Sequence, residues 1–311
     1  MVRLIVLACC LILVKSFSPS VSRSTLSLHT GPSSTSVSHT KLEAGYGRTG
    51  GYGRWSPGSL IVAMRRPDYL AALSYVGATA TQFTLLLMFL HLFQIGLLKN
   101  LFVPSFVAKV LPDVLSNYMP SPAQLQTFSV FMTMLFMSVR SRVFSPLDNS
   151  RPRASRSDKA FNRIKPWWQP PPLAFPIIWS SIAFLRAIST TMVFQQTGTM
   201  LTRPIFAMFL HLSCGDTWNT INNIEGRLGT AALTVPTVLA TAAYTTACYY
   251  TVSKKAAEVL FPSVVWLSVA NCLVYAIYKL NNRGNRYSMF PSKEEGPASK
   301  WMLPFARGFN R

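Results

Sequence analysis

The stretch that decides the fold is KPWWQPPPLAFPIIW, residues 165–179 of the 311-residue chain. It places Lys165 and two tryptophans, Trp167 and Trp168, directly before a run of prolines and a long apolar segment. Basic and aromatic side chains of this kind gather at membrane–water interfaces. Proline is tolerated in the first turn of a helix, because the N–H groups of that turn have no partner within the helix. The stretch therefore predicts the start of a transmembrane helix at the membrane surface.

The composition of the whole chain supports a membrane protein. Half of the residues are hydrophobic and only 13% are charged, whereas soluble domains carry about 25% charged residues. Segments of about 20 apolar residues can cross ~30 Å of hydrocarbon. Six such segments are expected, at residues 72–98, 122–139, 173–194, 204–224, 229–252 and 257–279. The sequence therefore predicts an all-α integral membrane protein.

The positive charge follows a topology pattern. The chain has 30 Lys and Arg against 10 Asp and Glu, a net charge of +20. With six spans, twenty of the basic residues fall on one side of the membrane and five on the other. Such a bias orients membrane proteins with the basic side toward the cytoplasm or its equivalent. The charge is therefore explained by topology and by contact with lipid headgroups, and no nucleic-acid partner is expected.

The first 44 residues have the composition of a targeting leader. Residues 1–14 combine Arg3 with a short apolar core, as in a secretory signal, and residues 15–41 are rich in Ser and Thr without an acidic residue, as in a transit peptide. With Phe17 near the junction, the leader resembles those of algae with secondary red-lineage plastids. The sequence therefore predicts a plastid membrane; an ordinary secretory signal, with an endomembrane or mitochondrial outer-membrane location, stays open.

Two later stretches matter for the same comparison as the first. They are HLSCGDTWN at residues 211–219 and LVYAIYKLN at residues 273–281. Together the three resemble the TspO/MBR family, also called translocator protein or tryptophan-rich sensory protein. The family patterns are matched at Lys165, Pro166, Trp168, Pro170, Pro171, Phe175, Trp179, Leu212, Trp218, Pro262 and Trp266. Pro176 and Ile177 depart from them, standing where the family has Gly-Pro. The polar fourth span resembles that of algal members of the family. The leader points to an algal member too.

The resemblance divides the chain into regions. It covers about residues 122–281 and implies a five-helix bundle there. We expect one extra span and an interfacial segment before the bundle. The full division is residues 1–44 for the leader, 45–68 for a Gly/Tyr/Arg linker, 69–121 for the extra span, 122–281 for the bundle and 282–311 for a basic tail.

The resemblance also implies a function. It implies a membrane-embedded binding protein, and a transporter or scavenger, for porphyrins, other tetrapyrroles or sterol-like rings, with no required cofactor and no catalysis. The bound ligand would be a porphyrin or a haem-like molecule. An alternative that stays open is weak photo-oxidative degradation of porphyrin, which would use the same pocket. It assigns Trp168, Trp218 and Trp266 to that pocket, with Ala270 one turn after Trp266. The remaining candidate binding residues are Trp167, Pro170, Pro171, Phe175, Trp179, His211 and Asn222.

Polar residues inside the apolar segments are a further pointer to function. An ionised side chain within a membrane is costly unless it is paired or hydrated. Arg186 and His211 lie in neighbouring spans, and a rise of ~1.5 Å per residue places them at similar depth. We predict a buried polar cluster of Arg186, Asp216 and Glu225. Such a cluster is either an interhelical ion-pair network or the polar wall of a ligand cavity.

Two weaker signals concern lipids and protein partners. Leu273, Tyr275 and Lys279 satisfy a loose cholesterol-recognition pattern. In residues 229–252, 14 of 24 residues are Gly, Ala or Thr, which suits close helix packing or a homodimer face. The alternative function is therefore a membrane-complex assembly or stress-signalling component that acts through helix–helix contacts. Besides the ring ligand and a second copy, membrane lipids are the expected partners.

Overall fold

The computed structural model describes residues 66–98, 121–147, 163–282 and 286–302. The predicted leader, the linker up to residue 65 and the interfacial segment at 99–120 lie outside these residues, and the predictions about them stand untested. The described residues all belong to one compact unit.

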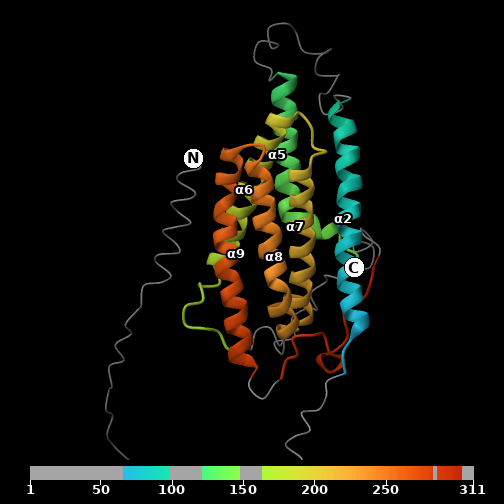
Figure 1. The fold of residues 1–311 in the computed structure, drawn as a ribbon, viewed down its shortest axis with the longest axis vertical. Coiled ribbons are helices and arrows are strands. Elements are labelled where there is room, and N and C mark those ends of the chain that lie inside the picture. Colours follow the sequence, from blue (N-terminus) through green and yellow to red (C-terminus); the bar gives the residue numbers. More distant parts are fainter. Residues whose placement is uncertain (1–65, 99–120, 148–162, 283–285, 303–311) are drawn as a thin grey trace, which may run out of the picture. The chain divides into compact units, whose positions relative to one another are not determined.

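Six long helices form the described part of the chain (Figure 1). Their bounds are α2 Tyr69–Leu98, α5 Pro122–Arg140, α6 Ala174–Thr197, α7 Arg203–Asn219, α8 Leu228–Tyr250 and α9 Lys254–Asn281. Three short helical elements accompany them: η2 Ser141–Phe144, the π-helix η3 Thr220–Glu225 that continues α7, and η4 Lys293–Glu295. The described residues contain isolated β-bridges but no strand. The prediction of an all-α fold is confirmed.

The helix ends follow from local sequence. Ser121 caps α5 through a capping box, in which its side chain accepts from the N–H of Gln124 and the Gln124 side chain accepts from the N–H of Ser121. At its far end, α6 stops at Gly198, whose φ of 67° lies in the left-handed region. Ser253 caps α9 by accepting from the N–H of Ala256 at 3.3 Å. These residues separate the apolar runs into distinct helices.

Each of the six predicted spans coincides with a helix, and four helices are long and apolar enough by themselves to cross a membrane. These four are Tyr69–Leu97 of α2, Ala174–Thr197, Leu228–Tyr250 and Lys254–Asn281. By contrast, α7 has only 17 residues but runs directly into η3, and α5 carries glutamines in its first turns. The chain is an integral membrane protein with a helical bundle.

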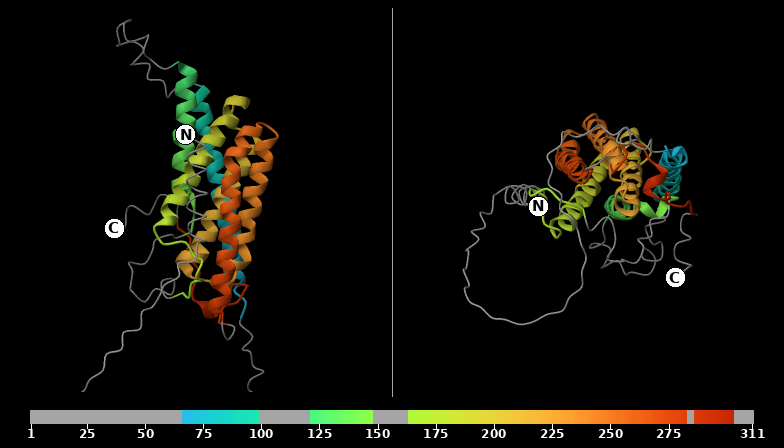
Figure 2. Two further views of the ribbon diagram at one scale, coloured as in Figure 1. Left: turned by 90° about the vertical axis from the view of Figure 1, so that its left-hand side faces the viewer. Right: turned by 90° about the horizontal axis from the view of Figure 1, so that it is seen from below.

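The packing pairs define an order around the bundle. α8 packs between α7 and α9, α6 packs between α9 and α5, and α2 packs on α7. α2 therefore stands at the edge opposite α9, as both views show (Figures 1 and 2). The largest apolar cluster joins all six helices and includes Leu90, Met134, Phe194, Phe209, Tyr249 and Leu260. The extra helix is thus packed into the same core as the other five.

The C-terminal segment 286–302 lies against the bundle at the end where α2 and α8 begin. The N–H of Asp68 donates to the carbonyl of Pro291 at 2.7 Å, and the indole of Trp301 donates to Ser74 Oγ at 2.6 Å. A β-carbon at Gly229, in the first turn of α8, would lie 2.0 Å from the carbonyl oxygen of Ser288. A glycine is therefore required there. The described part of the region that we assigned as a basic tail thus packs on the bundle.

Candidate functional site

The loop that carries the first tryptophan pair is pinned at its start. The Asn281 side chain, at the end of α9, accepts from the N–H of Ile164 at 2.9 Å and donates to its carbonyl at 2.8 Å. Arg163 donates to the side-chain oxygen of Asn222 at 3.1 Å and to its carbonyl at 2.6 Å. Burial lowers the pKa of the Arg163 guanidinium from its ordinary value. The candidate residue Asn222 therefore anchors the loop. Sequence reasoning missed Arg163 and used Asn281 only as the last residue of a motif.

The loop and the start of α6 place the candidate aromatic residues at different depths. Trp167 is 81% exposed and Trp168 is half-buried. Pro170 is buried, Pro171 is exposed, and Trp179 projects outward. Trp167 and Trp179 thus have the exposure of side chains that face the membrane or its interface, as such residues commonly do.

Trp266 lies at the centre of a buried aromatic site between α6 and α9. It is only 3% exposed, and Phe175 meets it edge-on with ring centroids 6.2 Å apart. Ile178 and Ile182 from the next turns of α6 complete the cluster. Among the described residues, the Trp266 indole N–H has no hydrogen-bond partner, and neither has the hydroxyl of buried Ser263, nearly one turn earlier on α9. We call Phe175, Ile178, Ile182 and Trp266 the aromatic site; Ala270, one turn beyond Trp266, is half-buried.

Trp218 lies in a different place from Trp266. Its indole N–H donates to the carbonyl of Ala231 in α8 at 3.1 Å. Its ring packs against apolar clusters that include Val235, Leu267 and Val274. In the described residues no aromatic contact joins it to Trp168 or Trp266. Trp218 therefore holds α7, α8 and α9 together, and no ring contact in the described part of the chain joins it to the other two tryptophans assigned to the pocket.

Arg186 and His211 meet in the middle of the bundle. Arg186 Nη2 lies 2.7 Å from His211 Nε2, and His211 Nδ1 lies 3.2 Å from the hydroxyl of Thr241. Both residues are buried, at 8% and 3% exposure. Because arginine can only donate, Nε2 is assigned as the acceptor and Nδ1 as the protonated nitrogen of a neutral ring. No described residue hydrogen-bonds to Arg186 Nε.

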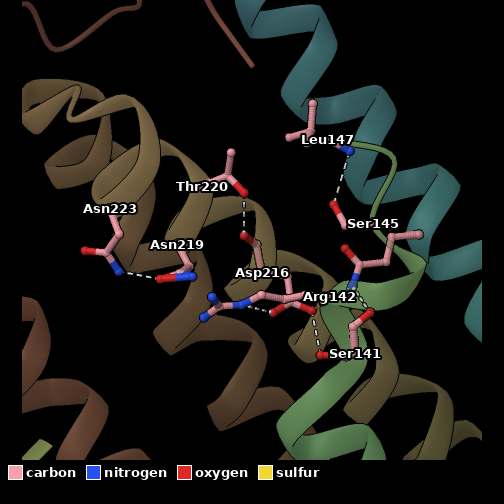
Figure 3. A network of polar contacts seen from close by, with 9 residues as sticks. Ser141, Arg142, Ser145, Leu147, Asp216, Asn219, Thr220 and Asn223 are labelled. Atoms are coloured by element: carbon pink, nitrogen blue, oxygen red, sulfur yellow. Dashed lines mark hydrogen bonds and ion pairs between the residues drawn. The ribbon is translucent and has the colours of Figure 1, made fainter. Parts of the chain in front are cut away.

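Asp216 has partners from two other elements, of which Figure 3 shows those of η2, Ser141 and Arg142. Its carboxylate accepts from Gln82 Nε2 of α2 at 2.7 Å and from the Ser141 hydroxyl of η2 at 2.5 Å. Arg142 Nε, also of η2, lies 3.2 Å from the other carboxylate oxygen. Asp216 therefore joins α7 to α2 and to the end of α5, and its side chain is satisfied by protein groups.

Glu225 belongs to a third set of contacts, at the end of the bundle where α2 and α8 begin. It pairs with Arg227 at 3.2 Å and accepts from the hydroxyl of Tyr75 in α2 and from the N–H of Ser299 in the C-terminal segment. The direct hydrogen bonds and ion pairs of Arg186, Asp216 and Glu225 thus form three separate sets, while Asp216 also interacts electrostatically with Arg186. The partners that α2 and the C-terminal segment supply could not be found from the spacing within the five-helix pattern.

The residues of the cholesterol-type pattern do not share a face of α9. Tyr275 is 45% exposed and the Lys279 ammonium lies 5.1 Å from the centre of its ring. Leu273, in contrast, is 5% exposed and points into the bundle. The pattern therefore corresponds to an outward Tyr–Lys pair with a separate core residue.

A groove of about 500 Å³ lies between α5 and α6, toward the end of the bundle remote from the loop. Phe128, Phe131, Ile188 and Met192 form its apolar walls, with Gln124 and Gln195 at its polar margin. None of the predicted ligand residues lines it. Within the described residues, no group of three or more His, Cys, Asp or Glu side chains could hold a metal ion.

The fold and these sites define a class of protein: an all-helical integral membrane bundle with an aromatic site and a buried polar pair in its interior. Comparison with known proteins then gives the family. Residues 130–280 match the model of the TspO/MBR family, so the bundle is similar to that family, as its motifs predict. Members of this family are membrane ligand-binding proteins.

Individual relatives align over the same region. The tryptophan-rich sensory protein of Cereibacter sphaeroides is 27% identical over 120 residues, which is 39% of this chain and 75% of the relative. The human translocator protein is 27% identical over 127 residues, with the same two shares. The translocator protein of Sus scrofa is 26% identical over 132 residues, 42% of this chain and 78% of the relative.

Proposed function

We propose that the bundle binds a hydrophobic ring compound, a porphyrin or another tetrapyrrole or a sterol-like molecule, at the aromatic site between α6 and α9, and moves or scavenges it. The observation that carries this proposal is the environment of the Trp266 indole. The indole is buried against Phe175, yet no group in the described part of the chain accepts from its N–H. A buried indole N–H normally finds a hydrogen-bond partner, so an acceptor on a ligand would complete the site.

The position of the loop supports the same proposal. The loop continues from its anchors on η3 and α9 through half-buried Trp168 to the first turn of α6, which supplies Phe175. A ligand that enters from the basic side would pass this loop before it reaches Trp266. Both ring nitrogens of His211 already face Arg186 and Thr241. We therefore propose binding by stacking and hydrogen bonding, without axial coordination of a metal by His211.

The test is a binding titration with protoporphyrin. We expect saturable quenching of tryptophan fluorescence and a shift of the porphyrin absorption band. Trp266→Phe keeps an aromatic ring but removes the N–H, and a lost hydrogen bond of about 1 kcal/mol weakens binding roughly fivefold. Trp167→Phe, at an 81% exposed position, is the matched control and leaves the affinity unchanged. Absence of saturable binding to the unaltered protein refutes the proposal.

A second candidate function, assembly or signalling through helix–helix contacts, is favoured by one observation. α8 presents small side chains on its outer face, with Ala240, Ala243 and Ala247 all exposed. Small residues allow close approach of a neighbouring membrane helix. Replacing Ala243 by Leu would then abolish a crosslinked dimer or complex, while porphyrin binding stays intact. If no crosslinked species forms with the unaltered chain, this candidate fails.

We also propose a plastid membrane as the location, on the basis of the leader composition alone. A fusion of residues 1–45 to a fluorescent reporter is expected to label plastids in an algal host. Diffuse secretion of the reporter, or labelling of the endoplasmic reticulum or mitochondria, contradicts this location.

A further inference from the structure

The buried cation Arg186 stands apart from the other buried charges of the bundle. Asp216 has Arg142 at 3.2 Å, and Arg227 pairs with both Asp68 and Glu225. No carboxylate of the described residues lies within ion-pair distance of Arg186. Its hydrogen-bond partner is His211, whose assigned tautomer is neutral. Asp216 acts on the Arg186 guanidinium only from beyond ion-pair distance, so this buried cation has no direct counter-ion among the described residues.

The buried polar atoms without a partner around Arg186 and Trp266 can all donate a hydrogen bond. Arg186 Nε, Trp266 Nε1 and Ser263 Oγ have no hydrogen-bond partner within the residues that the structure describes, and their side chains are more than nine-tenths buried. The arginine and indole nitrogens can only donate, and the serine hydroxyl can donate too. The missing partner is therefore a hydrogen-bond acceptor, and beside a buried cation the complementary acceptor is an anion.

The spacing on α6 connects this charge to the aromatic site. Ile182 belongs to the cluster around Trp266, and Arg186 follows it by four residues on the same helix. Residues four apart lie on the same face, about 6 Å apart along the axis. A flat ring held beside Trp266 would therefore bring a short side arm within reach of the Arg186 guanidinium.

We propose that the ligand of this bundle is a hydrophobic ring compound that bears a carboxylate on a short arm, and that Arg186 binds this carboxylate. The inference rests on the proposed binding of a ring compound and narrows its class. It favours a carboxylate-bearing tetrapyrrole over a neutral sterol, because a sterol would leave the buried guanidinium without a direct counter-ion. His211 acts as a positioning residue, since its neutral ring orients the guanidinium and is itself held by Thr241.

The experiment compares protoporphyrin IX, which has two carboxylates, with its dimethyl ester, which has none, at neutral pH. The ratio of their two dissociation constants is the readout. We expect the unaltered protein to bind the acid about tenfold more tightly than the ester, the size of one charge-assisted hydrogen bond. Arg186→Gln is expected to bring the ratio to about one by weakening acid binding, with ester binding unchanged.

Two controls make the outcome decisive. Arg203→Gln removes an exposed positive charge at the remote end of the bundle and is expected to keep the tenfold ratio. Arg186→Lys keeps the charge but loses the planar fork of donors, and an intermediate ratio is expected. A ratio near one in the unaltered protein, or an unchanged ratio in Arg186→Gln, overturns the inference. In either case, saturable binding of the ester still supports the proposed function. If neither compound binds saturably, the proposed function itself fails.

Discussion

Replacing Arg227 by methionine is expected to destabilise the bundle more than any surface substitution. Arg227 is 1% exposed, and its guanidinium lies 3.2 Å from Glu225, 3.3 Å from Asp68 and 2.7 Å from the carbonyl of Gly296. One side chain thus joins the start of α8 to α2 and to the C-terminal segment. Its removal leaves Glu225, whose side chain is only 3% exposed, as a buried carboxylate without its cation.

The expected magnitude follows from that uncompensated charge. Removing one partner of a buried ion pair costs about 3–5 kcal/mol. The double substitution Arg227→Met with Glu225→Gln removes the stranded charge as well. Its cost should therefore be smaller than the sum of the two single costs, by about 1–3 kcal/mol. Arg203→Met, at an exposed position, is the control and should stay within about 0.5 kcal/mol of the unaltered protein.

Unfolding in a mild detergent, followed by circular dichroism with increasing denaturant, measures these free energies. Protease cleavage within residues 286–302 gives a local readout, because loss of the Gly296 contact should free this segment. Two results would refute the reasoning: a cost for Arg227→Met no larger than that of Arg203→Met, or additive costs in the double variant. Either result would mean that the Arg227–Glu225 ion pair contributes no more to the free energy of unfolding than an exposed ion pair does.

Three further substitutions test other contacts in the bundle. Gly229→Ala should lower the unfolding midpoint and expose the C-terminal segment to protease, because the new β-carbon would lie 2.0 Å from the Ser288 carbonyl oxygen. Gly215→Ala, where the nearest atom is 4.0 Å away, should instead stabilise α7 by up to about 1 kcal/mol, and a loss there would contradict the packing. Gln82→Leu removes the amide that donates to Asp216 and should cost about 1–3 kcal/mol of unfolding free energy; an unchanged midpoint would show that α2 is not held by this contact.

The helices could be predicted from the sequence to within a few residues. The apolar runs are long, and residues such as Ser121, Gly198 and Ser253 mark the ends between them. Helix bounds depend on local chemistry, which the sequence carries directly. The depth of Arg186 relative to His211 was predictable for the same reason, because the rise per residue is constant and both residues lie in neighbouring antiparallel spans.

The partners of the buried polar groups could not be predicted in this way. Asp216 pairs with Gln82 and Ser141, which precede it by 134 and 75 residues. Which groups meet depends on how each helix is rotated and which helices are neighbours, and spacing within one segment determines neither. The same limit explains Trp218. Its motif assigned it to a pocket, whereas its rotation on α7 directs the indole to the Ala231 carbonyl.

The extra helix α2 changes what the buried charges of the bundle mean. Through Gln82, Tyr75 and the adjacent Asp68, it supplies partners for Asp216, Glu225 and Arg227. These charges therefore serve the attachment of α2 and of the C-terminal segment. Arg186 receives no such partner from α2, because α2 packs on α7 at the edge opposite α9, whereas Arg186 lies on α6. A charge buried in a membrane bundle for structural reasons is paired by the protein itself, so Arg186 is the position at which binding is best tested.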